Sequence, residues 1–189
     1  MRTRTIATTA ALLLAGTVGC SSNGDDSKPT VAKASETQTT SPTPSPTPSP
    51  SAETYKLGDT VDVDTEDGKF TAAALTYKAG GIPDVAGLLK GDQKWAVLEV
   101  KVCNKGPETI EVSPFVWSLA YADGARMEPM HMTGNELPQP LYPLEAKVKN
   151  GDCVRGNVLF QVPQQGTPER ALYSPDALDE PVEWTVPKA

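Results

Sequence analysis

The sequence predicts an all-β protein, with an antiparallel β-sandwich that follows a signal peptide and a disordered linker. Three observations predict it. Several stretches of residues 55–189 alternate apolar and polar positions with a period of two, which is typical of half-buried strands. Turn signals such as Asp67-Gly68 and Asn150-Gly151 separate these stretches. The 135 residues of this region are enough for one domain with its own core.

Residues 1–19 have the three parts of a secretory signal peptide. Arg2 and Arg4 form a short positive region, and Ile6–Val18 is a run of 13 residues without charge. Such a run is too short to span a bilayer core of about 30 Å as a stable helix. It has the length of the apolar region of a signal peptide instead.

The stretch Leu12–Cys20 (LLLAGTVGC) resembles the lipobox of bacterial lipoproteins, with Gly19 and Cys20 at its best-matched positions. The resemblance implies that Cys20 receives a diacylglyceryl group and becomes the mature N-terminus. The protein would then be lipid-anchored at the outer face of the cell membrane, because two acyl chains give stable anchoring. The alternative is an ordinary signal peptide, in which Cys20 has no such role.

Residues 20–54 are expected to be the lipidated Cys20 and a disordered linker. Of residues 21–54, 21 of 34 are Ser, Thr or Pro, and none is aromatic. A segment of this composition buries too little apolar surface to offset its loss of conformational entropy. Within it, Ser41–Pro50 repeats Ser-Pro-Thr-Pro, which favours polyproline II and predicts a semi-rigid spacer of roughly 30 Å.

The charge of the chain argues against nucleic acid as a partner. Without residues 1–19, which hold two arginines, 15 Lys and Arg stand against 24 Asp and Glu, a net charge of −9. Nucleic-acid binding depends on cationic side chains that neutralise phosphates. The expected partners are the membrane, through the lipid anchor, and a protein or cell-wall ligand.

Period-two alternation and turn residues define the strands in the domain. The clearest is 94–104, where Ala96, Leu98, Val100 and Val102 share one face. Long loops are expected at 79–93, with a turn of helix at Val85–Leu89, and at 129–144, which holds four prolines. The other expected strands are Thr60–Asp64, Phe70–Lys78, Thr109–Ser113, Phe115–Ala122, Ala125–Glu128, Cys153–Val162, Arg170–Tyr173 and Val182–Val186.

Cys103 and Cys153 form an even pair in an exported chain, which predicts a disulfide. Cys103 shares a strand face with Glu99 and Lys101, and Cys153 shares one with Arg155. Both faces lie opposite the aliphatic rows, so we expect a bond between neighbouring strands on the outer face of a sheet. Two reactive thiols are the alternative.

A family resemblance covers most of residues 57–175. It rests on Val97–Gly106 (VLEVKVCNKG), Tyr121–Gly124 (YADG) and Gly151–Pro163 (GDCVRGNVLFQVP). These motifs are similar to those of the telokin-like, immunoglobulin-fold domain of unknown function found on many Gram-positive and actinobacterial lipoproteins. The resemblance implies an immunoglobulin-like β-sandwich and no particular activity.

One short segment carries a metal-binding signal. Met127, Met130, His131 and Met132 are the three methionines of the mature chain and its only histidine, and they fall within six residues. Thioether and imidazole groups are ligands that suit copper. The alternative is that the methionines fill gaps in a hydrophobic core. An extended chain would also point Met130 and Met132 one way and His131 the other.

Other chemistries find less support. Asp62, Asp64, Glu66 and Asp67 precede Gly68 and suggest calcium, but the spacing fails the EF-hand pattern. They are more simply the solvent face and turn of an edge strand.

No nucleophile motif accompanies the single histidine, so we expect no enzyme and no resident cofactor, with copper as the alternative. The sequence favours a lipid-anchored binding module. Its candidate surface elements are Trp117, Tyr121, Tyr142 and residues 79–93, with core packing the competing interpretation for Trp117.

Overall fold

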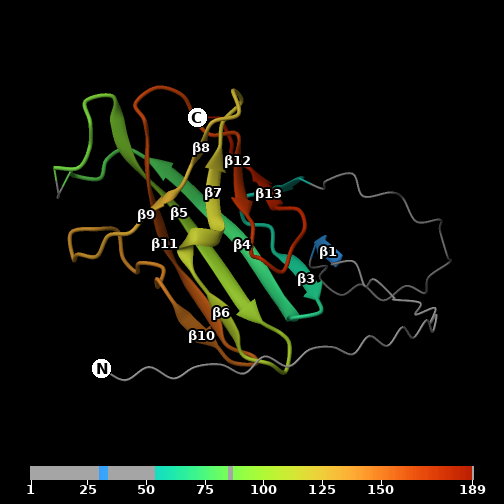
Figure 1. Cartoon of the computed structure of the whole chain (residues 1–189). Coiled ribbons are helices and arrows are strands. Elements are labelled where there is room, and N and C mark those ends of the chain that lie inside the picture. The colour runs from blue at the N-terminus through green and yellow to red at the C-terminus, as the bar shows by residue number, and fades with distance from the viewer. Residues whose placement is uncertain (1–29, 34–53, 85–86, 189) are drawn as a thin grey trace, which may run out of the picture.

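The computed structural model describes residues 30–33, 54–84 and 87–188. The predicted signal peptide, Cys20 and all of the predicted linker except residues 30–33 and 54 lie outside these residues. The described chain forms strands and one 3-10 turn, arranged as a β-sandwich, so the predicted fold class is confirmed (Figure 1). No helix in the described part is long and apolar enough to cross a membrane.

Two sheets make the sandwich. One has six strands in the order β1-β3-β4-β5-β11-β9, and the other has five in the order β2-β13-β12-β7-β8. A two-stranded sheet, β10-β6, extends the lower end in Figure 1. The strands are β1 (Thr30–Lys33), β2 (Thr54–Lys56), β3 (Val61–Thr65), β4 (Gly68–Ala79), β5 (Gln93–Asn104), β6 (Ile110–Val112), β7 (Trp117–Ala120), β8 (Arg126–Met127), β9 (Pro129–Met130), β10 (Ala146–Val148), β11 (Cys153–Pro163), β12 (Arg170–Tyr173) and β13 (Val182–Thr185).

The three long strands β4, β5 and β11 form the antiparallel centre of the six-stranded sheet. Their inward positions carry the small and branched side chains that the sequence alternation predicts. Ala72, Leu98, Val100 and Val102 are fully buried in the main core. Small side chains on β4 suit this position, because the opposite sheet brings bulky aromatic rings to the same layer.

Aromatic side chains fill the space between the sheets. Trp117 and Trp184 are fully buried, and their ring centroids lie 5.6 Å apart. The Tyr173 ring centroid is 4.5 Å from that of Trp117 and 6.2 Å from that of Phe70, which belongs to the facing sheet. The Trp184 indole N–H donates to the Asp59 carbonyl oxygen over 3.0 Å, so its polar atom is satisfied. This packing joins the two sheets into one core.

The disulfide lies where the sequence predicts it. Cys103 on β5 and Cys153 on β11 are direct register partners, with Cα atoms 4.0 Å apart and their sulfurs bonded. Both occupy the outer face of the six-stranded sheet. On the same two strands, Arg155 contacts Glu99 through its Nη2 atom at 2.7 Å. The bond therefore joins neighbouring strands rather than the two sheets.

The structure buries the candidate surface aromatics to different extents. Trp117 is buried in the main core, as the core-packing interpretation of the sequence expected. Tyr142 is also buried there, which corrects its prediction as a surface element, and Tyr121 is half-buried. Trp117 begins β7, whose strand is shorter than predicted. Ser113 accepts a hydrogen bond from the Phe115 N–H at 3.3 Å and starts a 3-10 turn over Pro114–Val116, where the sequence predicted a strand.

Other elements differ from the sequence expectation because tertiary pairing created them. β2, β9 and β10 were not expected, and each pairs with a strand distant in sequence. Residues 30–33 of the predicted disordered linker form β1 on the edge of the sandwich. The helical turn expected at Val85–Leu89 falls partly outside the described residues, and residues 87–89 are not helical.

Candidate functional site: a cleft at the edge of β11

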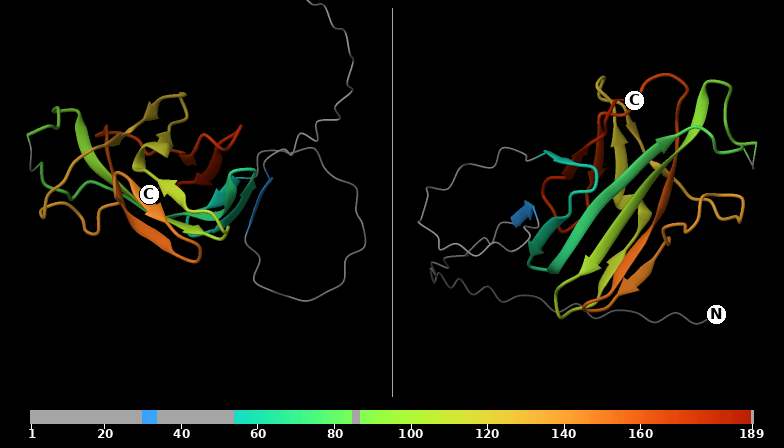
Figure 2. Two further views of the ribbon diagram at one scale, coloured as in Figure 1. Left: turned by 60° about the horizontal axis from the view of Figure 1, so that its bottom comes forward. Right: turned by 180° about the vertical axis from the view of Figure 1, so that it is seen from behind.

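A second hydrophobic cluster covers part of the outer face of the six-stranded sheet. Trp95 and Val97 of β5 and Leu159 of β11 are buried there together with Leu137 from a loop. Two segments lie over them, the described residues 80–84 and 87–92 and residues 131–141, which project on the same side of the molecule in both views of Figure 2. Further side chains packed against the cluster are Ile82, Leu89, Met130, Met132 and Leu141.

The four candidate metal ligands separate between the two clusters. Met127 packs on the main core, and its strand β8 pairs with β7 at Leu119. Met130 and Met132 pack on the second cluster, and His131 between them is exposed. The alternation expected of an extended chain is therefore present. The structure brings Met130, His131 and Met132 to one place and directs Met127 to another.

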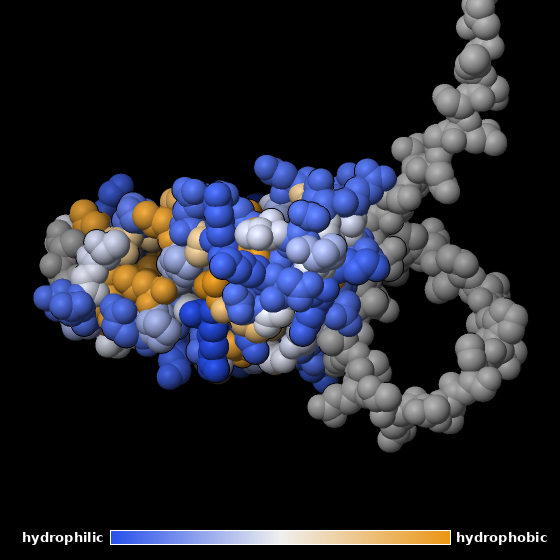
Figure 3. Space-filling model, turned by 90° about the horizontal axis from the view of Figure 1, so that it is seen from below, coloured by the Kyte–Doolittle hydropathy of each residue, from blue (hydrophilic) through white to orange (hydrophobic). Residues whose placement is uncertain are grey.

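A half-open cleft of about 450 Å³ lies beside this cluster. One wall is residues 130–133 and the other is residues 141–145, and the floor is Asn157–Leu159 of β11. Pro114 contributes from the 3-10 turn. Figure 3 shows hydrophobic side chains gathered on the left of the face seen from below, the side on which the two loops project.

The backbone of β11 sets the position of both walls. Pro129 and Met130 pair antiparallel with Phe160 and Leu159. Further along the same edge, the Asn157 N–H donates to the Pro140 carbonyl at 2.8 Å, and the Asn157 carbonyl accepts from the Tyr142 N–H at 3.0 Å. Both walls therefore begin as short pairings with one strand edge.

Polar groups border an otherwise apolar cleft. His131, Thr133, Glu145 and Asn157 line it with the apolar residues, and Asn157 donates its side-chain amide to the Pro138 carbonyl at 3.2 Å. The Tyr142 hydroxyl is buried, and within the described residues it has no hydrogen-bond partner. Burial, and then the neighbouring Tyr173, raises the pKa of Tyr142, so this phenol is neutral.

One of the three exposed large hydrophobic side chains in the described chain lines this cleft. It is Leu144, which is 41% exposed. Phe115 follows Pro114, which lines the cleft, and is 56% exposed, but it is not among the lining residues. The third is Leu88. Sequence reasoning missed Leu144, because it stands between strands beside a proline, where no periodic pattern marks it.

A hard-metal site is not assembled within the described residues. No three His, Cys, Asp or Glu side chains there are grouped to hold a metal ion. Asp62 and Asp64 are exposed on β3, and Asp64 pairs with Lys69 at 2.6 Å. These carboxylates form the solvent face of a strand, which is the simpler of the two interpretations of the sequence.

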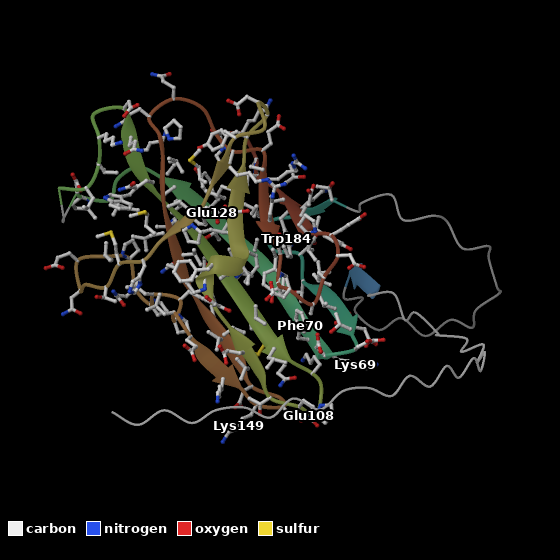
Figure 4. All side chains as sticks on the ribbon, in the orientation of Figure 1. Lys69, Phe70, Glu108, Glu128, Lys149 and Trp184 are labelled. Atoms are coloured by element: carbon white, nitrogen blue, oxygen red, sulfur yellow. A yellow bond between two sulfur atoms is a disulfide. The ribbon has the colours of Figure 1, made fainter. Side chains whose placement is uncertain are left out.

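The buried Asn104 explains one of the sequence motifs. Its side-chain oxygen accepts from the Gly106 N–H at 2.8 Å, and its amide donates to the carbonyls of Glu108 at 2.6 Å and Val148 at 2.8 Å. Glu108 and Lys149, labelled in Figure 4, show where these turns meet at the lower end of the sandwich. The Asn-x-Gly motif is thus structural and lies apart from the cleft.

The sequence of the domain matches the model of a known protein family. Residues 55–182 match the family model described as a domain of unknown function, DUF4352. The chain belongs to the DUF4352 family. The match begins at Tyr55 of β2 and ends at Val182, the first residue of β13, so the DUF4352 domain comprises nearly all of the sandwich and excludes β1. No curated protein sequence matches the chain.

Solved structures share the fold of this DUF4352 domain at low sequence identity. The secreted protein MPT63 of Mycobacterium tuberculosis is 15% identical with a TM-score of 0.57, and the match covers 73% of this chain and 100% of that protein. The yjhA protein of Bacillus subtilis is 15% identical with a TM-score of 0.52, covering 70% and 99%. The ycdA candidate lipoprotein of Bacillus subtilis is 16% identical with a TM-score of 0.50, covering 65% of this chain and 37% of that one.

Proposed function

We propose that this chain is a lipoprotein, anchored through Cys20 to the outer face of the cell membrane, and that its DUF4352 domain is a binding module without catalytic activity. The pattern of Leu12–Cys20 supports the anchor. The Cys103–Cys153 bond suits an oxidising, extracytoplasmic compartment. Similarity in fold to a secreted protein and to a candidate lipoprotein agrees with this location.

The cleft beside β11 is the proposed binding surface. The observation that carries this proposal is the position of Leu144, an exposed apolar side chain that lines a half-open, largely apolar cleft. Exposed apolar groups gathered at a concave surface with a few polar groups are typical of binding sites. The partner that fits is a protein segment of the cell envelope that inserts an apolar side chain.

Site-specific photocrosslinking tests the surface. A photoreactive phenylalanine analogue would be placed at Leu144 and, as a matched control, at Leu88, which is 46% exposed and is not among the residues lining the cleft. We expect a discrete crosslinked product from position 144 in intact cells, and a weaker or different one from position 88. Equal products from both positions, or none from position 144, would contradict a binding role for the cleft.

The anchor requires its own test. Feeding cells an alkyne-labelled fatty acid should label the chain, and Cys20→Ala should abolish the label and release the domain from the membrane fraction. An unlabelled chain that still sediments with membranes would contradict lipidation at Cys20. This outcome would leave the crosslinking result unaffected, because the residues that line the cleft are far from Cys20 in the sequence.

Copper binding is the second candidate function. It is favoured by one observation, that Met130, His131 and Met132 line the same cleft. Two thioethers and an imidazole are a soft ligand set that suits Cu(I). Because Met127 packs on the main core, this candidate uses three ligands rather than four.

A competition titration separates the two candidates. Cu(I) would be added to the chain in the presence of a chromogenic chelator, alongside a Met130→Ala, His131→Ala variant and a Met127→Ala control. Tight binding of one ion that is lost in the double variant and kept in the control would support copper. Binding that is absent, or equal in all three proteins, would reject it.

A further inference from the structure

The strand β1 lies at the edge of the sandwich and comes from the segment before the domain. Its residues Thr30–Lys33 pair antiparallel with β3 from Thr30 opposite Asp64 to Lys33 opposite Val61. It is the outermost strand of the six-stranded sheet and appears as the blue arrow beside β3 in Figure 1. The family match begins only at residue 55, so β1 is an addition to the shared domain.

The chain is fixed again at β2, immediately after the predicted linker. β2 pairs parallel with β13, with Tyr55 opposite Trp184. Tyr55 is buried in the main core, and its ring centroid lies 6.2 Å from that of Trp184. This attachment does not involve β1, so the domain boundary at residues 54–56 would stay in place if β1 left the sheet.

The attachment of β1 is short and one-sided. It consists of four residue pairs with one partner strand. A pairing of two strands has little stability by itself, and closing the 20-residue connection 34–53 adds an entropic cost. β1 therefore has far fewer residue pairs than the long strands β4, β5 and β11, and it is more easily detached than they are.

The strand β3 has features of a strand that can remain unpaired on its outer side. Asp62 and Asp64 point to solvent between the buried Val61 and Val63. Charged side chains on an edge strand discourage pairing with other proteins. The edge is therefore protected against pairing with unrelated strands when β1 is absent.

We propose that β1 is a detachable strap, and that its docking on β3 controls how far the domain stands from Cys20. With β1 docked, the nine residues 21–29 separate Cys20 from the sheet, a reach of about 30 Å. With β1 released, the 33 residues 21–53 give a reach on the order of 110 Å. The change in height rests on the proposed lipid anchor, whereas the docking itself does not.

Hydrogen exchange on the unlipidated chain tests the docking. The protein would be residues 20–189 with Cys20→Ser, and amide exchange would be followed by NMR for β3. In an antiparallel pair, every second residue of β1 donates its backbone N–H to β3. A Val31→Pro, Ala32→Pro variant replaces two successive residues, so it removes at least one of these donors whichever residues they are. Thr37→Pro, Gln38→Pro is the control, with the same two prolines outside β1.

We expect the β3 amides that face away from β4 to exchange at least tenfold faster in the β1 variant than in the parent or the control. Amides of β4 and β5 should be unchanged, because the domain stays folded.

Two results would overturn the proposal. Equal exchange at β3 in all three proteins would show that β1 does not cover the edge. Protection of β3 that grows with protein concentration, together with a dimer in light scattering, would assign the edge to residues 30–33 of a second copy. Neither result depends on lipidation, so a failure of the proposed anchor is distinguished by the Cys20→Ala labelling experiment.

Discussion

Gly156 and Tyr142 approach so closely that no side chain fits between them. A Cβ atom at residue 156 would lie 2.6 Å from the Tyr142 backbone nitrogen and 2.7 Å from its Cα. Both neighbours are backbone atoms of a segment that is hydrogen-bonded to Asn157, so they cannot move aside independently. This contact holds residues 141–145 against β11 and thereby positions one wall of the cleft.

Replacing Gly156 with alanine should therefore disturb the cleft. The added methyl group would push the Leu141–Tyr142 backbone from β11, and overpacking of this kind costs about 1–3 kcal/mol of unfolding free energy. Chemical denaturation would measure the loss, and NMR shifts of residues 140–145 would locate it. Gly91→Ala is the matched control, because a Cβ atom added there would have no neighbour within 4 Å. Equal stability of the two variants would contradict the close approach.

Removing the disulfide should destabilise the domain without changing its fold. Cys103 and Cys153 close a loop with a sequence separation of 50, which corresponds to about 4 kcal/mol in the chain-entropy model. We expect a Cys103→Ala, Cys153→Ala variant to unfold at clearly lower denaturant concentration while keeping its β-type circular dichroism. Adding a reductant to the parent should reproduce the shift. A midpoint unchanged by both treatments would mean that the bond contributes little.

Replacing Asn104 with alanine should lower the stability of the domain more than replacing an exposed asparagine. Its side chain makes three hydrogen bonds that join the turn at Gly106 to Glu108 and Val148. Asn104→Ala would leave the buried amide and carbonyl groups unsatisfied, at a cost of about 2–4 kcal/mol. The control is Asn150→Ala, at an exposed position. Similar melting temperatures for the two variants would count against this role.

Stability should fall in alkaline solution partly because of Tyr142. Burial, followed by Tyr173, raises the folded-state pKa of Tyr142 above its unfolded value of about 10. The folded protein then holds the phenol proton more tightly than the unfolded chain does. The contribution of Tyr142 to the free energy of unfolding is therefore complete below pH of about 10 and is lost as the pH rises above it. Tyr142→Phe should lose less stability than the parent between about pH 8 and pH 11, measured by denaturation. A parallel fall in both proteins would contradict the prediction.

Local patterns in the sequence were sufficient for the central strands and the disulfide. Alternation in β5 and β11 fixes which side chains face the core, because successive residues of a strand point to opposite faces. The same rule placed Cys103 and Cys153 on outer faces, where the structure joins them. It also separated His131, which is exposed, from Met130 and Met132, which pack on the second cluster, although all three line one cleft.

The second cluster and the cleft could not be derived in this way. Trp95 and Val97 stand on the face expected to meet solvent, and they are buried because side chains of two loops, among them Ile82, Leu89 and Leu137, pack over that face. Tyr142 lies in a proline-containing segment without alternation, yet it is buried in the main core. Such contacts join residues far apart in sequence, so no local pattern encodes them.

The sequence by itself determined the all-β class, the family, the turn positions and the pairing of the cysteines, since each depends on local alternation or on residue type. Only the tertiary structure decided which loops cover the outer face, that Met127 packs apart from Met130 and Met132, and that Leu144 remains exposed at a cleft. The physical reason is that burial is a property of the assembled layers. A side chain is buried by whichever segment packs over it. At the edge of β11, the segment around Tyr142 is held by backbone hydrogen bonds, and these bonds leave no pattern in the side chains.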